Sequence, residues 1–205
     1  MPTFTPSGAD GLRKPLKYLG AGLAASIGVA AGAFTLAVWL GELKAQRFVE
    51  VRVVPVPYVR DAASVRAGKA LYDSRCAECH RADGRGRVVI DEPGGYYVRA
   101  PNITPHSTSA VAGYAEADWV RAIRHGVDRA GRPLLEMPSE VYSRMNDADF
   151  AALVAYTRSL PAAEGETGVV RLSLAKKALY GIGAIGDSAG AIDHRRPTAA
   201  KRAAP

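Results

Sequence analysis

The first strong pattern along the chain is an uncharged, mainly apolar run near its start. Residues 18–41 contain no Asp, Glu, Lys or Arg, and a helix of this length can cross a hydrocarbon core of about 30 Å. The apolar region of a cleaved signal peptide is shorter, roughly 7–15 residues, and no good small-x-small cleavage site follows this run. We therefore predict an uncleaved transmembrane anchor over 18–41, preceded by a cytoplasmic N-terminus over 1–17.

Basic side chains flank both ends of this run. Arg13, Lys14 and Lys17 lie before it, and by the positive-inside rule they place the N-terminus in the cytoplasm. Lys44 and Arg47 lie after it and weaken that assignment. The distribution of charge therefore favours one orientation without settling it, and a second argument is needed.

Three amphipathic helices are predicted in the central part of the chain, over 62–74, 116–124 and 147–159. Asp61 suits the N-cap of the first helix, and Gly126 suits the position just past the second. Asn146 suits the N-cap of the third helix, which Pro161 then stops. The central domain, residues 61–161, is therefore predicted to be all-α with long loops.

The segments between these stretches are predicted to be irregular. In residues 42–60, Pro55 and Pro57 break any strand ladder and favour an extended tether. Residues 81–113 are rich in Gly, Pro, Arg and Ser without a sustained period, which indicates a loop. No strand is predicted anywhere in the chain.

The net charge of +7 and the pI near 9.6 first suggest a nucleic-acid partner. Residues 61–160, however, hold thirteen basic and thirteen acidic side chains. The excess positive charge lies in the flanking segments, away from the domain that would need it to bind nucleic acid. We therefore expect no nucleic-acid partner.

The only two cysteines, Cys76 and Cys79, are followed directly by His80. A Cys-x-x-Cys-His motif is the attachment motif of c-type haem. Its two thiols add across the two haem vinyl groups as thioethers, and the imidazole that follows reaches the iron from one face. We predict one covalently attached haem c, with His80 as the proximal ligand of the iron.

Three other interpretations of the cysteines are weaker. A structural zinc site needs two further ligands at paired spacing, and His106, His125 and His194 are scattered. A thioredoxin-like dithiol needs a βαβ setting, and a disulfide between Cys76 and Cys79 closes too short a loop to stabilise much. Haem attachment occurs outside the cytoplasm, so it supplies the second argument for orientation: the domain faces the periplasm.

The sixth ligand of the iron can be argued from the few methionines. Met1 is the initiator, and Met145 precedes the Asn146 cap, where an apolar residue at a helix junction is expected. Met137 lies in a Gly- and Pro-containing loop directly before Pro138, whose fixed backbone suits holding a thioether sulfur in one place. We predict Met137 as the distal ligand, with a second histidine as the less favoured alternative.

With these residues in view, the chain resembles the class I (His/Met) cytochromes c over residues 61–161. The resemblance rests on Cys76–His80 and on three further segments, 100–104, 131–138 and 147–161. It implies the class I cytochrome c fold, in which three main helices surround a covalent haem. It also implies a close crossing of the first and last helices, at Gly68 and Tyr156.

The resemblance further implies which residues support the ligands. The carbonyl of Pro101 would accept the proton on the non-ligating nitrogen of His80. Asn102 would hydrogen-bond a haem propionate, although an ordinary turn role suits it equally well. Trp119 could touch the haem, but an aromatic residue on a helix is more often part of the core.

More narrowly, the chain is similar to bacterial membrane-bound cytochromes with two or three haem modules, which are often dehydrogenase subunits. In that group a module ends in an Ile-Asp-His stretch, matched here by Ile192–His194, and another Cys-x-x-Cys-His module usually follows. This sequence ends at Pro205 without one. We therefore expect a one-haem protein.

The expected function follows from an iron with both axial positions filled. No position remains for a substrate, so the protein is expected to be an electron carrier and not an enzyme. It would serve redox partners at the bacterial inner membrane, such as a dehydrogenase, an oxidase or another cytochrome. Two alternatives are a haem sensor or peroxidase, and a cytochrome subunit of a membrane-bound dehydrogenase or oxidase complex.

The C-terminal extension, residues 162–205, gives the weakest signal. Residues 169–185 carry apolar positions with interspersed basic ones, which suits an amphipathic helix. Such a helix would either lie on the lipid bilayer or cover the haem domain. The basic end, residues 195–202, is predicted to be disordered and to contact anionic lipid.

Overall fold

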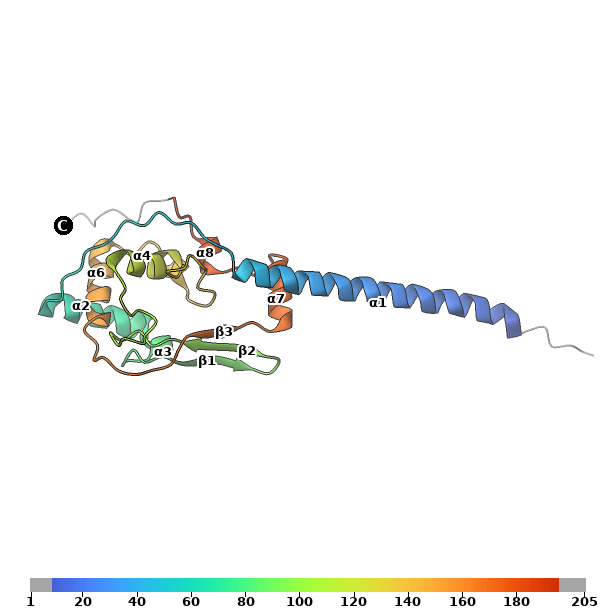
Figure 1. The fold of residues 1–205 in the computed structure, drawn as a ribbon, viewed down its shortest axis with the longest axis horizontal. Helices are drawn as coiled ribbons and strands as arrows, with labels where there is room; N and C mark the ends of the chain where they lie inside the picture. Colours follow the sequence, from blue (N-terminus) through green and yellow to red (C-terminus); the bar gives the residue numbers. More distant parts are fainter. Residues whose placement is uncertain (1–8, 196–205) are drawn as a thin grey trace, which may run out of the picture.

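The computed structural model describes residues 9–195, and the side chains of residues 17–195. A single long helix, α1 (Ala9–Ala45), projects from a compact body that holds all the other elements (Figure 1). Residues 9–17 of the predicted cytoplasmic N-terminus belong to α1, whereas residues 1–8 and the basic end from 196 onward lie outside the described residues, so their placement stays a prediction.

The helix α1 contains the whole run predicted to be the anchor, residues 18–41, and extends beyond it at both ends. Lys17–Ala45 is long and apolar enough, by length and composition, to cross a membrane. The helix continues past Gly41 because residues 42–45 are good helix formers without a breaker. Residues 42–45, predicted as the start of the tether, are therefore helical.

Two of the predicted helices begin at the predicted caps. In α2 (Ala62–Arg75), the Asp61 carboxylate accepts hydrogen bonds from the backbone N–H groups of Ala63 and Ser64, at 2.9 and 2.8 Å. In α6 (Asp147–Thr157), the side-chain oxygen of Asn146 accepts from the N–H of Asp149 at 2.9 Å. The structure confirms both caps.

The helices α2 and α6 cross at the predicted glycine. A Cβ atom at Gly68 would lie 1.9 Å from the carbonyl oxygen of Ala152 and 2.8 Å from the Cβ of Tyr156. The rings of Tyr72 and Tyr156 meet beside this point, with centroids 5.1 Å apart. The absence of a side chain at Gly68 therefore allows the two backbones to touch.

The second predicted helix, α4 (Glu116–His125), ends at Gly126, which takes the left-handed conformation (φ 64°) expected there. Its apolar face joins α2 and α6 in one core. The buried members of that core are Val56, Tyr72, Val111, Trp119, Val120, Ile123, Tyr142, Phe150, Leu153, Val154 and Leu160. Three one-turn helices were not predicted: α3 (Ala77–His80), α5 (Ser139–Tyr142) and α8 (Ser188–Ala191).

The prediction that the chain contains no strand is wrong. A three-stranded antiparallel sheet has the order β1 (Arg87–Glu92), β2 (Tyr96–Ala100) and β3 (Val169–Arg171). Gly94 and Gly95 form the β1–β2 turn with φ angles of 94° and 88°, which suit glycine. Along β2 every second position is buried, and a search for the period of a helix does not detect this pattern.

Residues 46–61 lie along the body instead of hanging free of it (Figure 1). The N–H of Val49 donates to the carbonyl of Gly131 at 2.8 Å, and the ring of Phe48 packs over Gly131. Val56 is part of the buried core. The two prolines do give the extended backbone that was predicted, but the segment is bound to the domain.

The C-terminal extension returns along the sheet to the base of α1. After β3 it forms α7 (Leu174–Gly181), which packs on α1, and then α8, which contacts α5. The predicted helix over 169–185 is therefore shorter than expected, because its first three residues pair with β2.

Candidate functional site

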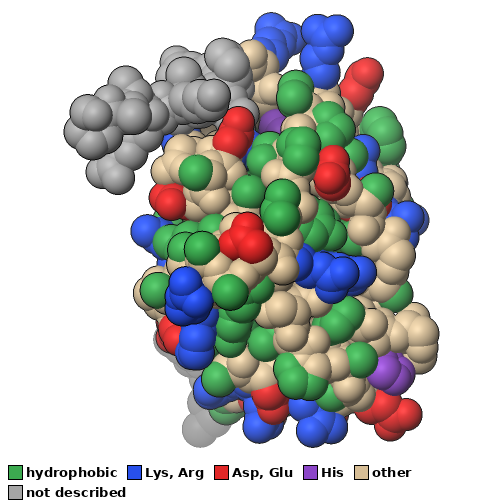
Figure 2. Space-filling view, turned by 90° about the vertical axis from the view of Figure 1, so that its left-hand side faces the viewer, with side chains coloured by type: hydrophobic (Ala, Val, Ile, Leu, Met, Phe, Trp, Pro, Cys, Tyr) green, Lys and Arg blue, Asp and Glu red, His purple; other side chains and the backbone are tan. Residues whose placement is uncertain are grey.

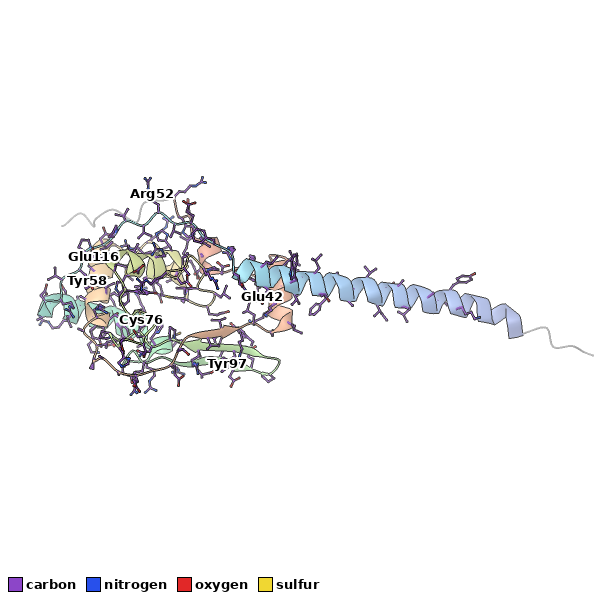
Figure 3. The ribbon with its side chains drawn as sticks, in the orientation of Figure 1. Glu42, Arg52, Tyr58, Cys76, Tyr97 and Glu116 are labelled. Carbon is purple, nitrogen blue, oxygen red and sulfur yellow. The ribbon has the colours of Figure 1, made fainter. Side chains whose placement is uncertain are left out.

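Cys79 and His80 lie in the short helix α3, and Cys76 is the residue between the end of α2 and the start of α3. The carbonyl of Cys76 accepts hydrogen bonds from the N–H groups of Cys79 and His80, at 3.2 and 2.9 Å. Both cysteines are free thiols, and burial raises the pKa of Cys76 to about 11. Figure 3 shows Cys76 within the body, on the side of α3. One helical turn thus presents two unpaired thiols and an imidazole together.

His80 is held by the loop that follows β2. Its Nδ1 lies 3.0 Å from the carbonyl oxygen of Pro101. Burial lowers the pKa of the imidazole, so the neutral ring donates from Nδ1 and leaves Nε2 unprotonated. An imidazole fixed in this tautomer is ready to bind a metal ion through Nε2.

The chain turns sharply after His80. Arg81 has a φ of 65°, and among the described residues it is the only one other than glycine with a positive φ. The hydroxyl of Tyr72 donates to the Arg81 carbonyl at 2.8 Å, and the N–H of Gly86 donates to the His80 carbonyl at 3.1 Å. Such strained backbone persists only where its surroundings hold it, and these two hydrogen bonds hold the turn in place.

Asn102, predicted as either a propionate ligand or a turn residue, has the contacts of a turn. Its side-chain oxygen accepts from the N–H of Thr104 at 2.8 Å, and its amide donates to the carbonyl of Ala163 at 2.8 Å. The backbone N–H of Asn102 donates to the carbonyl of Glu166 at 2.7 Å. The side chain thus fastens the Pro101 loop to the start of the C-terminal extension.

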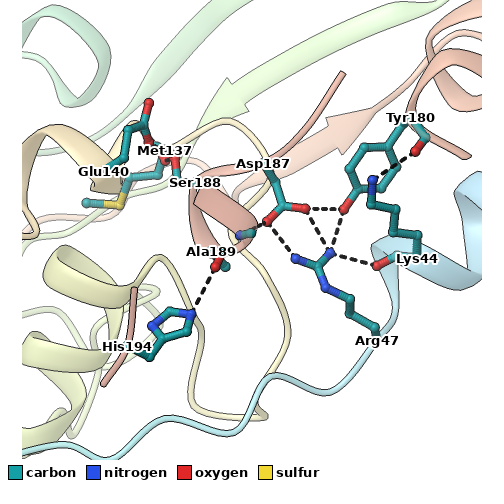
Figure 4. Close-up of polar contacts among 10 residues, drawn as sticks. Lys44, Arg47, Met137, Glu140, Tyr180, Asp187, Ser188, Ala189 and His194 are labelled. Carbon is teal, nitrogen blue, oxygen red and sulfur yellow. Dashed lines mark hydrogen bonds and ion pairs between the residues drawn. The ribbon is translucent and has the colours of Figure 1, made fainter. Parts of the chain in front are cut away.

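Met137 and Met145 both pack against the buried core, on which Cys76 also lies. The carbonyl oxygen of Met137 accepts from the N–H of Ser139 at 2.8 Å and from the hydroxyl of Ser188 at 2.6 Å (Figure 4). The structure therefore brings the Met137 loop and α3 to one core, and it holds the loop by backbone contacts.

Ser188 and its neighbour Asp187 were not singled out from the sequence. Asp187 accepts two hydrogen bonds of 2.8 Å from the Arg47 guanidinium, one from Tyr180 and one of 2.8 Å from the N–H of Gly190 (Figure 4). Burial raises the pKa of this carboxyl, but these hydrogen bonds outweigh the effect and hold the pKa below its ordinary value. A charged cluster thus joins the end of α1 to the segment that supports Met137.

The described residues fit a haem better than a zinc ion. They contain no group of three or more His, Cys, Asp and Glu side chains that could hold a metal ion. Trp119 is 3% exposed, and its buried Nε1 has no hydrogen-bond partner. A buried donor of this kind calls for an acceptor, which a haem propionate supplies. Two thiols, a neutral imidazole, a thioether and this indole N–H together suit haem c.

His125 lies in the last turn of α4, where it is buried beside Arg124. Its Nδ1 is 2.9 Å from Nδ1 of His194, whose Nε2 is 2.9 Å from the carbonyl oxygen of Ala189. Both contacts are satisfied when His194 donates to the Ala189 carbonyl and accepts from Nδ1 of His125.

This pair predicts an acid-sensitive fold. Burial and the neighbouring His194, Arg124 and Arg121 lower the pKa of His125 from 6.5 to about 4. Between these two pH values the unfolded chain binds more protons than the native one, so the free energy of unfolding falls as the pH falls. Between pH 7 and pH 4, the melting temperature of the wild type should fall more steeply than that of His125→Gln.

His106, which is half-buried and whose Nδ1 lies 2.9 Å from the Thr108 hydroxyl, provides the control for this prediction. His106→Gln should leave the pH dependence of the melting temperature as in the wild type. A His125→Gln variant with the same slope as the wild type between pH 6.5 and pH 4 would contradict the assignment.

Comparison with known proteins identifies the central part of the chain. Residues 63–156 match the family model described as cytochrome c oxidase, cbb3-type, subunit III. The fructose dehydrogenase cytochrome subunit of Gluconobacter japonicus is 32% identical over 111 residues, which are 50% of this chain and 22% of that protein. The cytochrome c subunit of the quinone alcohol dehydrogenase of Gluconacetobacter polyoxogenes is 36% identical over 104 residues, 47% of this chain and 22% of that protein.

A third relative, the cytochrome c subunit of the gluconate 2-dehydrogenase of Pantoea cypripedii, is 35% identical over 86 residues, 40% of this chain and 19% of that protein. The chain thus spans about a fifth of the length of these relatives. In each case the match covers about half of this chain or less. Residues 63–156 are therefore similar to the cytochrome c subunits of these dehydrogenases.

Proposed function

We propose that this protein is a membrane-anchored c-type cytochrome with one haem, which carries single electrons between respiratory partners. Cys76 and Cys79 form the thioether bonds, and His80 and Met137 bind the iron. The observation that carries the proposal is the 3.0 Å contact of His80 Nδ1 with the Pro101 carbonyl, beside two free thiols. It leaves Nε2 of a neutral imidazole as a ligand next to both attachment points.

The bound haem supplies a one-electron couple. His80 and Met137 would hold the iron, so that no coordination position would be open to a substrate and no ligand would be exchanged. A thioether ligand also raises the reduction potential relative to a second imidazole. This favours a carrier over a sensor, a peroxidase or any other catalyst.

The class I arrangement is part of the same proposal. The helices α2, α4 and α6 would be its three main helices, and the domain would extend over residues 61–161. Support comes from the α2–α6 crossing at Gly68 and from Trp119 on α4. Trp119 is part of the buried core, and its indole N–H has no hydrogen-bond partner. The Trp119 N–H would then donate to a haem propionate.

The proposed location is the inner membrane of a bacterium, with the haem domain in the periplasm. Residues 18–41 of α1 would form a single transmembrane pass, supported by the length and apolar composition of Lys17–Ala45. Haem is attached to such proteins outside the cytoplasm, which fixes the orientation. Redox proteins at the membrane and the bilayer itself would be the partners, and nucleic acid would not.

A second candidate function is that of a cytochrome subunit in a membrane-bound dehydrogenase or oxidase complex. It is favoured by the names of the relatives, which are subunits of fructose, alcohol and gluconate dehydrogenases. The face of α1 that carries Gly20, Gly28 and Gly32 is also open, with no other atom within 4 Å of a Cβ placed there. Co-purification from native membranes in mild detergent distinguishes a subunit from a free carrier.

The haem stoichiometry tests the proposal directly. Denatured full-length protein should keep one haem per chain and give the pyridine spectrum of a haem with two thioether bonds. Cys79→Ser should shift that spectrum toward the one-thioether form. Haem that acid acetone extracts from the wild type, or a ratio other than one, would contradict the proposal.

A further inference from the structure

The helix α7 packs against α1 within the uncharged run that forms the proposed anchor. A Cβ atom at Gly41 would lie 2.1 Å from the carbonyl oxygen of Lys177, and one at Gly181 would lie 2.0 Å from that of Ala37. The two backbones therefore touch along residues 37–41, as the adjacent ribbons in Figure 1 show. If α1 spans a bilayer, this contact places α7 at the level of the last turns of the span.

The polar groups of α7 are turned toward the protein. Lys177 forms an ion pair of 2.7 Å with Glu42, at the end of α1. Nζ of Lys176 lies 3.8 Å from the ring centroid of Tyr96 in the sheet. The hydroxyl of Tyr180 joins the Asp187 cluster. Each of these side chains already has a partner within the domain.

The opposite face of α7 is apolar and exposed. Leu174, Leu179 and Ile182 are 61%, 43% and 65% exposed, and no charged residue occurs between Ala178 and Gly186. At about 100° per residue, Leu174, Leu179 and Ile182 fall within an arc of about 140° around the axis of α7 and the turn after it. A soluble surface rarely leaves such a contiguous patch uncovered.

This patch continues onto α1 and differs from the far end of the body. Trp39, Leu40 and Leu43, in the same turns of α1 that pack against α7, are 57%, 39% and 50% exposed. At the end of the body opposite α1, Lys, Arg, Asp and Glu side chains are interspersed with the hydrophobic ones (Figure 2). The uncharged surface is thus gathered where the body meets the proposed anchor.

We propose that α7 and residues 182–186 lie in the bilayer interface, with Leu174, Leu179 and Ile182 inserted among the lipid chains. The inference rests on the proposed function, which makes α1 a membrane anchor. Lipid is the occupant because the patch is continuous with the exposed apolar surface of α1. Lys44, whose Nζ donates to the Tyr180 carbonyl at 3.0 Å, marks the polar edge of the patch.

The proposal changes how the haem domain is held. An anchor followed by a free tether would let the domain rotate and move away from the membrane. An interfacial helix fixed to both α1 and the sheet gives a second attachment, so one side of the domain always faces the lipid.

Depth measurement in a membrane tests this. The full-length holoprotein carrying Ile182→Cys or Leu174→Cys is labelled with bimane and reconstituted in vesicles of phosphatidylethanolamine and phosphatidylglycerol. Brominated lipid should quench both labels, and aqueous iodide should not. Val29→Cys on α1 is the lipid-exposed control, and Val59→Cys, at an apolar position 68% exposed on the body, is the water-exposed control.

The interfacial placement of α7 and the proposed function can fail independently of each other. Quenching of the Ile182 and Leu174 labels by iodide and not by lipid, as at Val59, would overturn the interfacial placement and leave a protein partner to cover the patch. Labelling of the wild type would show instead that Cys76 and Cys79 are free, which contradicts the haem attachment. Quenching of the Val29 label by iodide would contradict the anchor itself.

Discussion

Replacing Met137 with Ala is expected to abolish the weak sulfur-to-iron band at the red end of the oxidised spectrum. The same variant should bind carbon monoxide when reduced, because alanine offers no ligand for the distal position. The loop itself should stay in place, since Ser139 and Ser188 hold the Met137 backbone carbonyl and not its side chain. Optical spectra of the oxidised, reduced and carbon monoxide-treated protein check this.

Met145 provides the matched control, because it packs against the same core. Met145→Ala should keep the red band and should not bind carbon monoxide. Its main cost should be in stability, through the cavity left by the lost side chain. If the two variants behave the other way round, Met145 is the distal ligand. If the band survives in both, the iron has another ligand.

Gly68→Val should lower the free energy of unfolding by about 3 kcal/mol. A side chain at Gly68 meets the backbone of Ala152, which cannot turn aside as a flexible side chain would. The valine must therefore push α2 away from α6 and open the contact between the Tyr72 and Tyr156 rings. Denaturant unfolding of the holoprotein, followed by circular dichroism, measures the loss.

Ala70→Val separates this clash from the helix propensity of valine. Ala70 is exposed on the same helix, so valine there should cost only about 0.5 kcal/mol. Equal losses in the two variants would mean that the crossing does not depend on the glycine.

The helices of the body were predictable because their signals are local. Asp61 and Asn146 each bind backbone N–H groups two or three residues away, and Gly126 needs only its own backbone freedom. The sheet depends instead on distant pairing. Val170 pairs with Val98, far away in the sequence, so β3 has no local reason to be a strand. The Gly94–Gly95 turn before Tyr96 was the signal that could have revealed β1 and β2.

The candidate site also contains features that local sequence signals predict and features that depend on distant contacts. The cysteine and histidine spacing is a local motif, and it indicates haem c before any fold is known. The contact between His80 and Pro101 joins residues 21 positions apart, and only the family resemblance pointed to it. The hydrogen bond from Ser188 to Met137 could not be predicted, because a serine in a weakly patterned extension carries no mark of its distant partner.

The contacts of residues 46–61 have a consequence for modularity. A soluble fragment that began at the domain boundary suggested by the sequence would lack Arg47, and Asp187 would keep its buried position without its cation. It would also lack Val56 from the core. Residues 46–60 and the body therefore form one structural unit, and the smallest independent fragment must retain this segment.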